Sequence, residues 1–460
     1  MYKIDFSKPI HIHFIGIGGI SMSGLAEILH EEGFTISGSD SKESDLTKTL
    51  AAKGIKVIYG QSADNITSDI DLVVYTAAIH ESNPEFAAAK AAGIPMLTRA
   101  ELLGQIMDNY DYSIAVAGTH GKTTTTSMIS EILLAAQTDP TISVGGILSS
   151  IHGNLRVGDS EYFISEACEY TNSFLNFRPR YSIILNIEAE HLDFFKDLED
   201  IKHSFRCFAE RVPAETGTVI ANYDDANTMD ALRGIARKVI TFGLNAKADV
   251  YAQNIVHRGS VSEFDIYHRG NYFARVTLHV PGIHNVRNAL AATAAAIVLG
   301  VSPNAVKYGL AGFEGAGRRF DFKGKFQGAD LYDDYAHHPS ELRALLDAVD
   351  TLNYQRTIVV FQPHTYSRTA KLFNDFVEQL RRPTIVYLAE IYAAREKNTI
   401  GISSADLAAQ IPGAKFYPTF AEIERELRRI ARPGDIILTV GAGDVFRIGE
   451  HLLQQSDSEN

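Results

Sequence analysis

Cysteine and positive charge are both scarce in this chain. Of its 460 residues only two are cysteines, Cys168 and Cys207, so a disulfide framework is excluded and a reducing compartment fits best. Lysine and arginine number 43 against 56 for aspartate and glutamate, which gives a net charge of −13. This balance argues against broad binding of nucleic acid or of an anionic membrane, although it leaves room for local phosphate pockets.

A long hydrophobic run is also absent. The longest stretch of small apolar residues, 289–300, is far shorter than the roughly 20 residues needed to span a bilayer. The first residues have neither the basic start nor the apolar core of a signal peptide. We therefore expect a cytoplasmic protein that neither binds nucleic acid nor inserts into a membrane. Both a monomer and a homodimer fit the sequence.

What the chain does contain is a regular alternation of short β-like runs and helical stretches. This pattern predicts an α/β protein with mostly parallel sheets, and 460 residues allow about three domains. We place these domains at 1–107, 108–321 and 322–460. The first has the pattern of half a dinucleotide-binding fold, and the second carries a P-loop-type sequence. Alternation at 249–281 predicts a small antiparallel sheet in the central domain, and the glycine-rich segment 312–317 predicts a hinge.

The most informative stretch is a strand, a glycine loop, a lysine and a helix in succession. Residues 114–117 form an apolar run, 118–123 predict a tight loop, and 124–135 have helical spacing. Backbone N–H groups point into such a loop, the helix dipole favours an anion, and Lys122 adds a full charge. The stretch therefore predicts a site for the phosphates of a nucleoside triphosphate. Its residues are Gly118, Thr119, His120, Gly121, Lys122, Thr123 and Thr124.

One position departs from the strict phosphate-loop fingerprint. That pattern has a glycine five places before Gly121, where this chain has Val116. The alternative interpretation is an ordinary turn rich in glycine and threonine. We favour the triphosphate site, in which the hydroxyl of Thr123 or Thr124 reaches a Mg²⁺ bound to the same phosphates.

A second glycine loop follows the first predicted strand. It resembles a dinucleotide-binding fingerprint, and Asp40 comes 24 residues after Gly16, where a ribose-binding acid belongs. Ser21 occupies the third glycine position, so the loop predicts a pyrophosphate-bearing ligand without specifying NAD. The alternative is a turn that serves only helix–sheet packing. The residues expected at this ligand are Gly16, Gly18, Gly19, Ile20, Ser21 and Asp40.

Polar side chains at the ends of two central strands extend the predicted triphosphate site. Glu166 and His191 each follow a strong strand pattern. Because ligands of open α/β sheets gather at the carboxyl ends of strands, we expect both side chains near Lys122 as ligands of Mg²⁺, although histidine is less usual for a hard cation. Taken singly, each fits an ordinary loop residue. Glu169, three residues after Glu166, either lies in the outer coordination shell of the Mg²⁺ or has no role.

Further candidates lie beside the hinge and at the first strand of the third domain. Arg318 and Arg319 can reach phosphates once domains close, or they are plain solvated arginines. Residues 333–339 put many titratable side chains at a strand end, before a helix whose predicted N-cap is Ser340. Such a concentration of polar groups indicates a site, although either histidine of this segment also fits packing at the helix start.

Two more groups lie at the end of a strand and the start of a helix. His364 and Arg368 follow a strand at 357–361. His284 and Asn288 lie at the start of an alanine-rich helix, where amide groups can read an adenine edge. Both groups are therefore candidate ligand contacts.

In their order along the chain, these segments resemble the motifs of the Mur ligases. The resemblance covers nearly the whole sequence. It rests on the segments 13–24, 118–124, 166–170, 186–191, 284–285, 317–321, 333–339, 362–364 and 441–444. Each segment alone is a weak signal, whereas the ordered set is specific.

The resemblance implies three domains and an activity. One domain would bind a UDP-sugar, one would bind ATP, and a Rossmann-like C-terminal domain would close over both. The implied enzyme uses ATP and Mg²⁺ to join L-alanine to the carboxylate of UDP-N-acetylmuramate for peptidoglycan synthesis. The reaction would pass through an acyl phosphate and release ADP and phosphate.

The resemblance also implies roles for residues at matching positions. Lys122 would hold the ATP phosphates. The residues expected at Mg²⁺ are Thr123, Glu166 and His191. Those expected at the remainder of ATP are His284, Asn288, Arg318 and Asp334. The UDP diphosphate would lie against Gly18, Gly19 and Ser21. The muramoyl group or the transferring phosphate would contact Arg319, His337 and Arg368. The expected catalytic residues are Lys122, Glu166, His191, Arg319 and His337.

Two departures from the family pattern have consequences. Thr365 stands where the family often has arginine, so either Arg368 alone supplies that charge or the contact is weaker. Several family members carry a carbamylated lysine after the His191 motif. Lys196 and Lys202 match no such pattern, so we predict no modification here.

Three alternatives remain beside this interpretation. A sister ligase attaches a recycled tripeptide to the same sugar, although segment 315–320 and the N-terminal glycine loop favour L-alanine as the acceptor. A nicotinamide-dependent dehydrogenase would use the first domain, but Ser21 and the downstream triphosphate loop argue against it. A non-catalytic nucleotide switch would hydrolyse ATP slowly whatever the acceptor. The sequence does not choose among L-alanine, glycine and L-serine.

Overall fold

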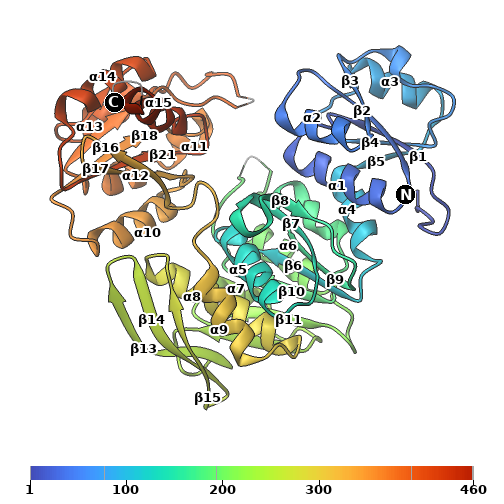
Figure 1. The fold of residues 1–460 in the computed structure, drawn as a ribbon, viewed down its shortest axis with the longest axis horizontal. Helices are drawn as coiled ribbons and strands as arrows, with labels where there is room; N and C mark the ends of the chain where they lie inside the picture. Colours follow the sequence, from blue (N-terminus) through green and yellow to red (C-terminus); the bar gives the residue numbers. More distant parts are fainter. Residues whose placement is uncertain (1, 77, 193, 395, 458–460) are drawn as a thin grey trace. The chain divides into compact units, whose positions relative to one another are not determined.

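The computed structural model describes residues 2–76, 78–192, 194–394 and 396–457, and these form two compact units. The first consists of Met1–Ala252, Ile266–Ala274 and Asn288–Gly309, and the second of Gln253–Asp265, Arg275–Arg287 and Leu310–Asn460. Three sheets are distributed over these units (Figure 1). No helix in the described residues is long and apolar enough to cross a membrane. The domain limits near residues 107 and 321 stay predictions.

The N-terminal sheet, blue in Figure 1, has five parallel strands in the order β3-β2-β1-β4-β5. Its strands are β1 His11–Ile15, β2 Thr35–Asp40, β3 Lys56–Tyr59, β4 Leu72–Tyr75 and β5 Met96–Thr98. Its helices are α1 Ile20–Glu31, α2 Asp45–Ala52, the short η1 Ala63–Asn65, α3 Pro84–Ala91 and α4 Arg99–Met107. The strand order reverses between β1 and β4, and ligands of open parallel sheets bind at that point. The glycine loop after β1 is therefore well placed for a ligand.

The central sheet has ten strands in the order β15-β14-β13-β12-β11-β10-β6-β9-β7-β8. The strands are β6 Tyr112–Ala117, β7 Thr141–Leu148, β8 Gly153–Arg156, β9 Tyr162–Glu166, β10 Tyr181–Ile184, β11 Thr218–Asn222, β12 Val239–Gly243, β13 Val250–Arg258, β14 Val261–His268 and β15 Asn271–Leu278. The strands from β7 to β12 along this order pair in parallel, and β8 pairs antiparallel with β7. Because β6 lies between β10 and β9, the loops after these three strands share one edge.

The predicted small antiparallel sheet consists of β13, β14 and β15. Only two residues join each of these strands to the next, which is a connection suited to antiparallel hairpins. The three strands do not stand apart, because β13 pairs in parallel with β12 and so continues the central sheet. The helical segments of this region are α5 Lys122–Ala135, η2 Ser149–Ile151, η3 Tyr170–Asn176, α6 Leu198–Ala209, α7 Ala226–Ala231, α8 Ile283–Val298 and α9 Pro303–Gly312.

The C-terminal sheet, orange to red in Figure 1, has six strands in the order β16-β17-β21-β18-β19-β20. They are β16 Asp321–Phe326, β17 Ala329–Asp334, β18 Arg356–Phe361, β19 Ile385–Leu388, β20 Lys415–Phe416 and β21 Asp435–Val440. Only β16, at the edge, pairs antiparallel with its neighbour among the described pairings. The helices are α10 Pro339–Asp350, α11 Tyr366–Lys371, α12 Phe373–Leu380, α13 Ser404–Gln410, α14 Phe420–Ile430 and α15 Phe446–Asp457.

Two helices of the C-terminal domain differ from the sequence prediction. α10 begins earlier than expected, with His338 rather than Ser340 as its N-cap. Pro339 suits the first helical turn because it lacks an N–H, and the His338 imidazole accepts the Ser340 N–H in the place of a hydroxyl. The amphipathic spacing of residues 369–380 predicts one helix there, but the structure has two, α11 and α12, which are divided at Leu372 because its backbone is non-helical.

Candidate active site

The phosphate loop between β6 and α5 is built around two glycines. Gly121 caps α5 with φ of +86°, a left-handed conformation that glycine adopts without strain. Gly118 has φ of +147°, and a Cβ there would lie 2.9 Å from the Leu185 Cβ. The loop therefore follows a path closed to larger residues and ends at Lys122, the first residue of α5. The N–H groups in the first turn of α5 and the dipole of this helix favour an anion at this point.

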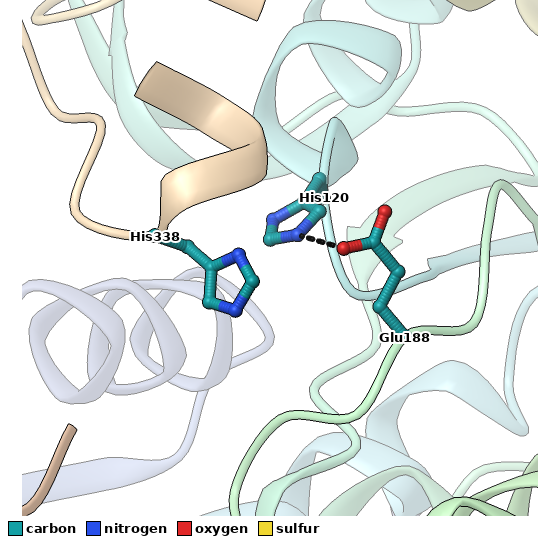
Figure 2. A group of neighbouring side chains, drawn as sticks. All are labelled: His120, Glu188 and His338. Carbon is teal, nitrogen blue, oxygen red and sulfur yellow. Dashed lines mark hydrogen bonds and ion pairs between the residues drawn. The ribbon is translucent and has the colours of Figure 1, made fainter. Parts of the chain in front are cut away.

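The loop is fixed by the segment that follows β10. The Asn186 side-chain oxygen accepts the His120 N–H at 2.8 Å, and its amide nitrogen donates to the His120 carbonyl at 3.0 Å. The Thr119 hydroxyl accepts the Glu188 N–H at 2.9 Å. The His120 ring lies 3.3 Å from the Glu188 carboxylate (Figure 2); His338, also labelled there, caps α10 in the second unit. Backbone geometry is thus fixed before any ligand binds.

Lys122 is held by a carboxylate that the sequence alone left without a clear role. Its ammonium donates to Glu169 at 2.9 and 3.2 Å, and to the carbonyls of Gly118 and Thr119 at 2.5 and 3.1 Å. Burial acts to lower the pKa of Lys122, but the charge and hydrogen bonds of Glu169, together with the charges of Cys168 and Glu190, outweigh it and raise the pKa above its ordinary value. Lys122 is therefore a fully charged, pre-oriented cation inside the loop.

The predicted metal ligands fall into two groups. Glu166 ends β9 opposite Val116 of β6, and its carboxylate accepts the Gly145 N–H at 2.6 Å. His191 lies with Glu169 and Glu190, and one ligand atom from each lies within 4.8 Å of the others. Two carboxylates and an imidazole are a donor set that fits a divalent cation. The structure thus supplies suitable donors at this edge, while the assignment of Thr123, Glu166 and His191 to Mg²⁺ stays a prediction.

Side chains from other turns contact the N-terminal glycine loop and hold it in place. The Asp40 carboxylate, at the end of β2, accepts the Gly18 N–H at 2.9 Å. A Cβ on Gly18 would lie 2.8 Å from that carboxylate and 2.7 Å from the Thr47 methyl, so glycine is required for the close approach. The Ser21 hydroxyl accepts a hydrogen bond from Arg99 at 2.9 Å. Sequence reasoning missed Arg99, because no motif marks it.

The paired arginines beside the hinge have different environments. The Arg318 guanidinium donates to Asp333 at 2.8 Å and to the carbonyls of Gly441 and Gly443 at 2.7 and 3.1 Å. Arg318 therefore links β17 to the turn after β21, and its predicted contact with ATP stays a prediction. Arg319 lies over the Tyr335 ring at 5.0 Å and 3.9 Å from Glu341. Arg319 thus has fewer protein contacts than Arg318 and stays a predicted ligand contact.

Asp334, predicted at the ATP ribose, is fixed by backbone donors. Its carboxylate accepts the N–H groups of Phe320 and Ala336 at 2.7 and 2.8 Å. Burial raises the pKa of Asp334 to about 6, against the opposing effect of the Arg319 charge. A ribose hydroxyl is a neutral donor that such a carboxylate can accept, so the geometry is compatible with the predicted role.

The remaining third-domain candidates form one chain of side chains. His337 lies 3.2 Å from Glu341, and its ring centre is 5.7 Å from that of His364. Arg368 in turn lies 3.1 Å from the His364 ring nitrogen. Thr365, in the position where an arginine was expected, has φ of +69° and starts α11. The structure thus brings His337, His364 and Arg368 together at the ends of β17 and β18.

The predicted adenine contacts both lie on α8. A Cβ on Gly121 would lie 2.8 Å from the Asn288 side-chain oxygen, so Asn288 lies directly against the phosphate loop. Burial, together with the Arg287 charge, lowers the pKa of His284 to about 4. His284 is therefore neutral near pH 7 and presents an uncharged ring.

Comparisons with known proteins identify the family. Three family models match consecutive parts of the chain: "Mur ligase family, catalytic domain" at 11–111, "Mur ligase middle domain" at 116–296 and "Mur ligase, glutamate ligase domain" at 318–443. A protein of Agathobacter rectalis named UDP-N-acetylmuramate–L-alanine ligase is 67% identical, covering 99% of this chain and 100% of its own. One of the same name from Lachnospira eligens is 55% identical over the same shares. The chain belongs to the Mur ligase family.

Solved structures agree with this assignment. The crystal structure of UDP-N-acetylmuramate-alanine ligase from Thermotoga maritima has a TM-score of 0.83 and 28% identity, covering 98% of this chain and 100% of that one. A murein peptide ligase from Psychrobacter arcticus has a TM-score of 0.73 and 25% identity, covering 97% and 98%. The resemblance to Mur ligases and the predicted three-domain α/β fold are thereby confirmed.

Proposed function

We propose that the protein is an ATP-dependent ligase that joins L-alanine to the carboxylate of UDP-N-acetylmuramate. The carboxylate attacks the γ-phosphate of ATP and gives an acyl phosphate and ADP. The amine of L-alanine then attacks the acyl phosphate, and inorganic phosphate leaves. The observation that carries this proposal is the 67% identity, over both full chains, with a ligase of that name. The Lys122 loop supplies the required cation.

The first step brings two anions together, so it depends on positive charge. Lys122, held in the loop by Glu169, neutralises charge on the transferring phosphate. The N–H groups and the dipole at the N-terminus of α5 support the same phosphates. Mg²⁺, for which Thr123, Glu166 and His191 are the proposed ligands, would add further charge neutralisation.

The nucleotide sugar is assigned to the N-terminal sheet. The edge that carries the Gly16–Ser21 loop and Asp40 is where parallel sheets bind ligands, and the loop has the close backbone approach that a diphosphate needs. Arg319, His337 and Arg368 are the proposed contacts of the muramoyl group or the phosphate in transfer. ATP and a nucleotide sugar are cytoplasmic metabolites, and we place the reaction there.

Water must be excluded from the acyl phosphate. We propose that the C-terminal domain closes over both ligands, with the glycine-rich segment 312–317 as the hinge. Gly315 in this segment has φ of +116°, a conformation that favours glycine. Closure would also deliver Arg319 and His337, which follow the hinge in the sequence.

The test is release of ADP by purified protein with substrates omitted one at a time. ADP should accumulate at a substantial rate only when UDP-N-acetylmuramate and L-alanine are both present, and the product should have the mass of the amide. Full ADP release without either substrate would contradict the proposal. Parallel reactions with glycine, L-serine and the murein tripeptide define the acceptor. The tripeptide is included because a murein peptide ligase shares the fold.

A further inference from the structure

Arg99 is the only arginine among the first 107 residues. It is the first residue of α4 and directly follows β5, so its Cα lies at the carboxyl edge of the N-terminal sheet. The glycine loop after β1 and Asp40 at the end of β2 lie at that same edge, because all five strands are parallel. The sheet thus places its one guanidinium beside the predicted diphosphate loop.

The side chain of Arg99 reaches that loop. One terminal nitrogen donates to the Ser21 hydroxyl at 2.9 Å, and Ser21 lies in the first turn of the 12-residue helix α1. The dipole of α1 and the N–H groups of its first turn favour an anion at the same point. An arginine fork and a helix N-terminus, contributed by two different βα turns, therefore converge on one place.

Within the described residues, Arg99 forms no ion pair with a carboxylate. Glu101, on the same helix, is engaged elsewhere: it accepts the Thr98 N–H at 2.7 Å and the Thr98 hydroxyl at 2.9 Å in a capping box. Burial lowers the pKa of the Arg99 guanidinium from its ordinary value. A half-buried cation without a counter-charge costs free energy, and an anionic ligand removes that cost.

We propose that Arg99 binds an oxyanion of the nucleotide-sugar substrate. This inference rests on the function proposed above and names a binding residue for it. Two groups of that substrate share the required chemistry: the diphosphate and the muramoyl carboxylate. A planar guanidinium offers paired donors to either one, which a lysine ammonium does not.

The experiment measures binding of two nucleotide sugars to the full-length protein by calorimetry. UDP-N-acetylmuramate carries both anionic groups, and UDP-N-acetylglucosamine carries the diphosphate without the carboxylate. Arg99→Met should weaken binding of UDP-N-acetylmuramate about 10- to 100-fold, the scale of hydrogen bonds to charged groups. An equal loss for both ligands assigns Arg99 to the diphosphate, and a loss confined to UDP-N-acetylmuramate assigns it to the carboxylate.

Controls separate binding from folding. Lys90→Met removes an equal charge from an exposed position on α3 and should leave both affinities unchanged. ATP affinity of Arg99→Met should stay within about twofold of the wild type. Arg99→Lys keeps the charge without the fork and should give an intermediate loss, and it replaces the methionine variant if that variant fails to fold.

Two results would overturn the inference in different ways. If both Arg99 variants bind the nucleotide sugars as the wild type does, or lose ATP affinity equally, Arg99 is a structural residue. If the wild-type protein binds neither nucleotide sugar, the proposed function fails and the assignment of Arg99 fails with it.

Discussion

Both glycine loops of this protein are predicted to bind phosphate groups, but the positive charge near each loop comes from a different place in the chain. Each follows the first strand of its sheet and opens a helix, α1 in one case and α5 in the other. The central loop carries its own cation, Lys122, one residue after its last glycine and paired with Glu169. The N-terminal loop contains no basic residue. Its nearby guanidinium comes from Arg99, 78 residues beyond the serine that it contacts.

This difference indicates what each loop must do. A loop that assists phosphoryl transfer needs a cation fixed within it, because the charge it stabilises develops during the reaction. A loop that only holds a diphosphate needs close backbone approach and a charge within reach. Loss of the cation in the central loop should therefore impair turnover, whereas substitutions in the N-terminal loop should impair binding of the nucleotide sugar.

The largest expected effect follows removal of the internal cation. Lys122→Ala should lower turnover at least about 1,000-fold, the scale of a lost electrostatic stabiliser in phosphoryl transfer. Binding of UDP-N-acetylmuramate should survive, because the variant leaves the N-terminal sheet intact. ADP release and calorimetry measure the two quantities. Loss of both would mean that the functions of the two loops are wrongly divided.

The partner of that cation should matter next. Glu169→Gln keeps the shape and one acceptor but removes the charge that orients Lys122. We expect kcat to fall about 10- to 100-fold, as is typical when a supporting carboxylate is lost. The KM for ATP should change much less than kcat. Asp139→Asn removes an exposed carboxylate paired with Arg156 and serves as a control that should keep full activity. An unchanged kcat in Glu169→Gln would show that the ion pair is only structural.

The comparison also shows which parts of the candidate site can be predicted from the sequence. Apolar runs located the strands, and the strand-end rule placed Glu166 and His191 at the edge where the phosphate loop lies. Lys122 was identified because glycine, lysine and threonine occur together in one short segment. These are local signals, and a local pattern is enough when the interacting residues are neighbours in the chain.

Contacts between turns that lie far apart in the sequence could not be predicted from it. The Arg99–Ser21 hydrogen bond depends on the packing of α4 beside α1, and no spacing rule encodes it. The Glu169–Lys122 ion pair depends on the path of the chain after β9, where Thr171 and Asn172 take left-handed conformations that propensity does not foresee. The His338 cap was missed for a related reason, since an imidazole there replaces the usual hydroxyl.

A pair of glycine substitutions should separate the two loops. Gly121→Ala forces alanine into a left-handed conformation and places its methyl group against Asn288. Because this strain costs ~1–2 kcal/mol, we expect ATP binding to weaken about tenfold. Gly18→Ala puts a methyl against Asp40 and Thr47, and should weaken nucleotide-sugar binding by a similar factor. Each variant should retain the other affinity. A crossed result, in which Gly18→Ala weakens ATP binding, would contradict the division.

The smallest expected effect is on the pH dependence of protein stability. It arises at His284, one of the predicted adenine contacts. Because the pKa of His284 falls from its ordinary value of 6.5 to about 4 in the folded protein, folding favours the neutral ring. The stabilising contribution of the neutral ring is complete above pH 6.5 and is lost as the pH falls toward 4. His284→Gln should therefore show a weaker fall in melting temperature between pH 7 and pH 4.5 than the wild type. His203→Gln, which changes an exposed histidine of α6, should follow the wild-type curve. If the melting temperatures of His284→Gln and the wild type fall equally, the His284 ring is hydrated enough to protonate freely. The prediction of an uncharged adenine contact at this position would then be wrong.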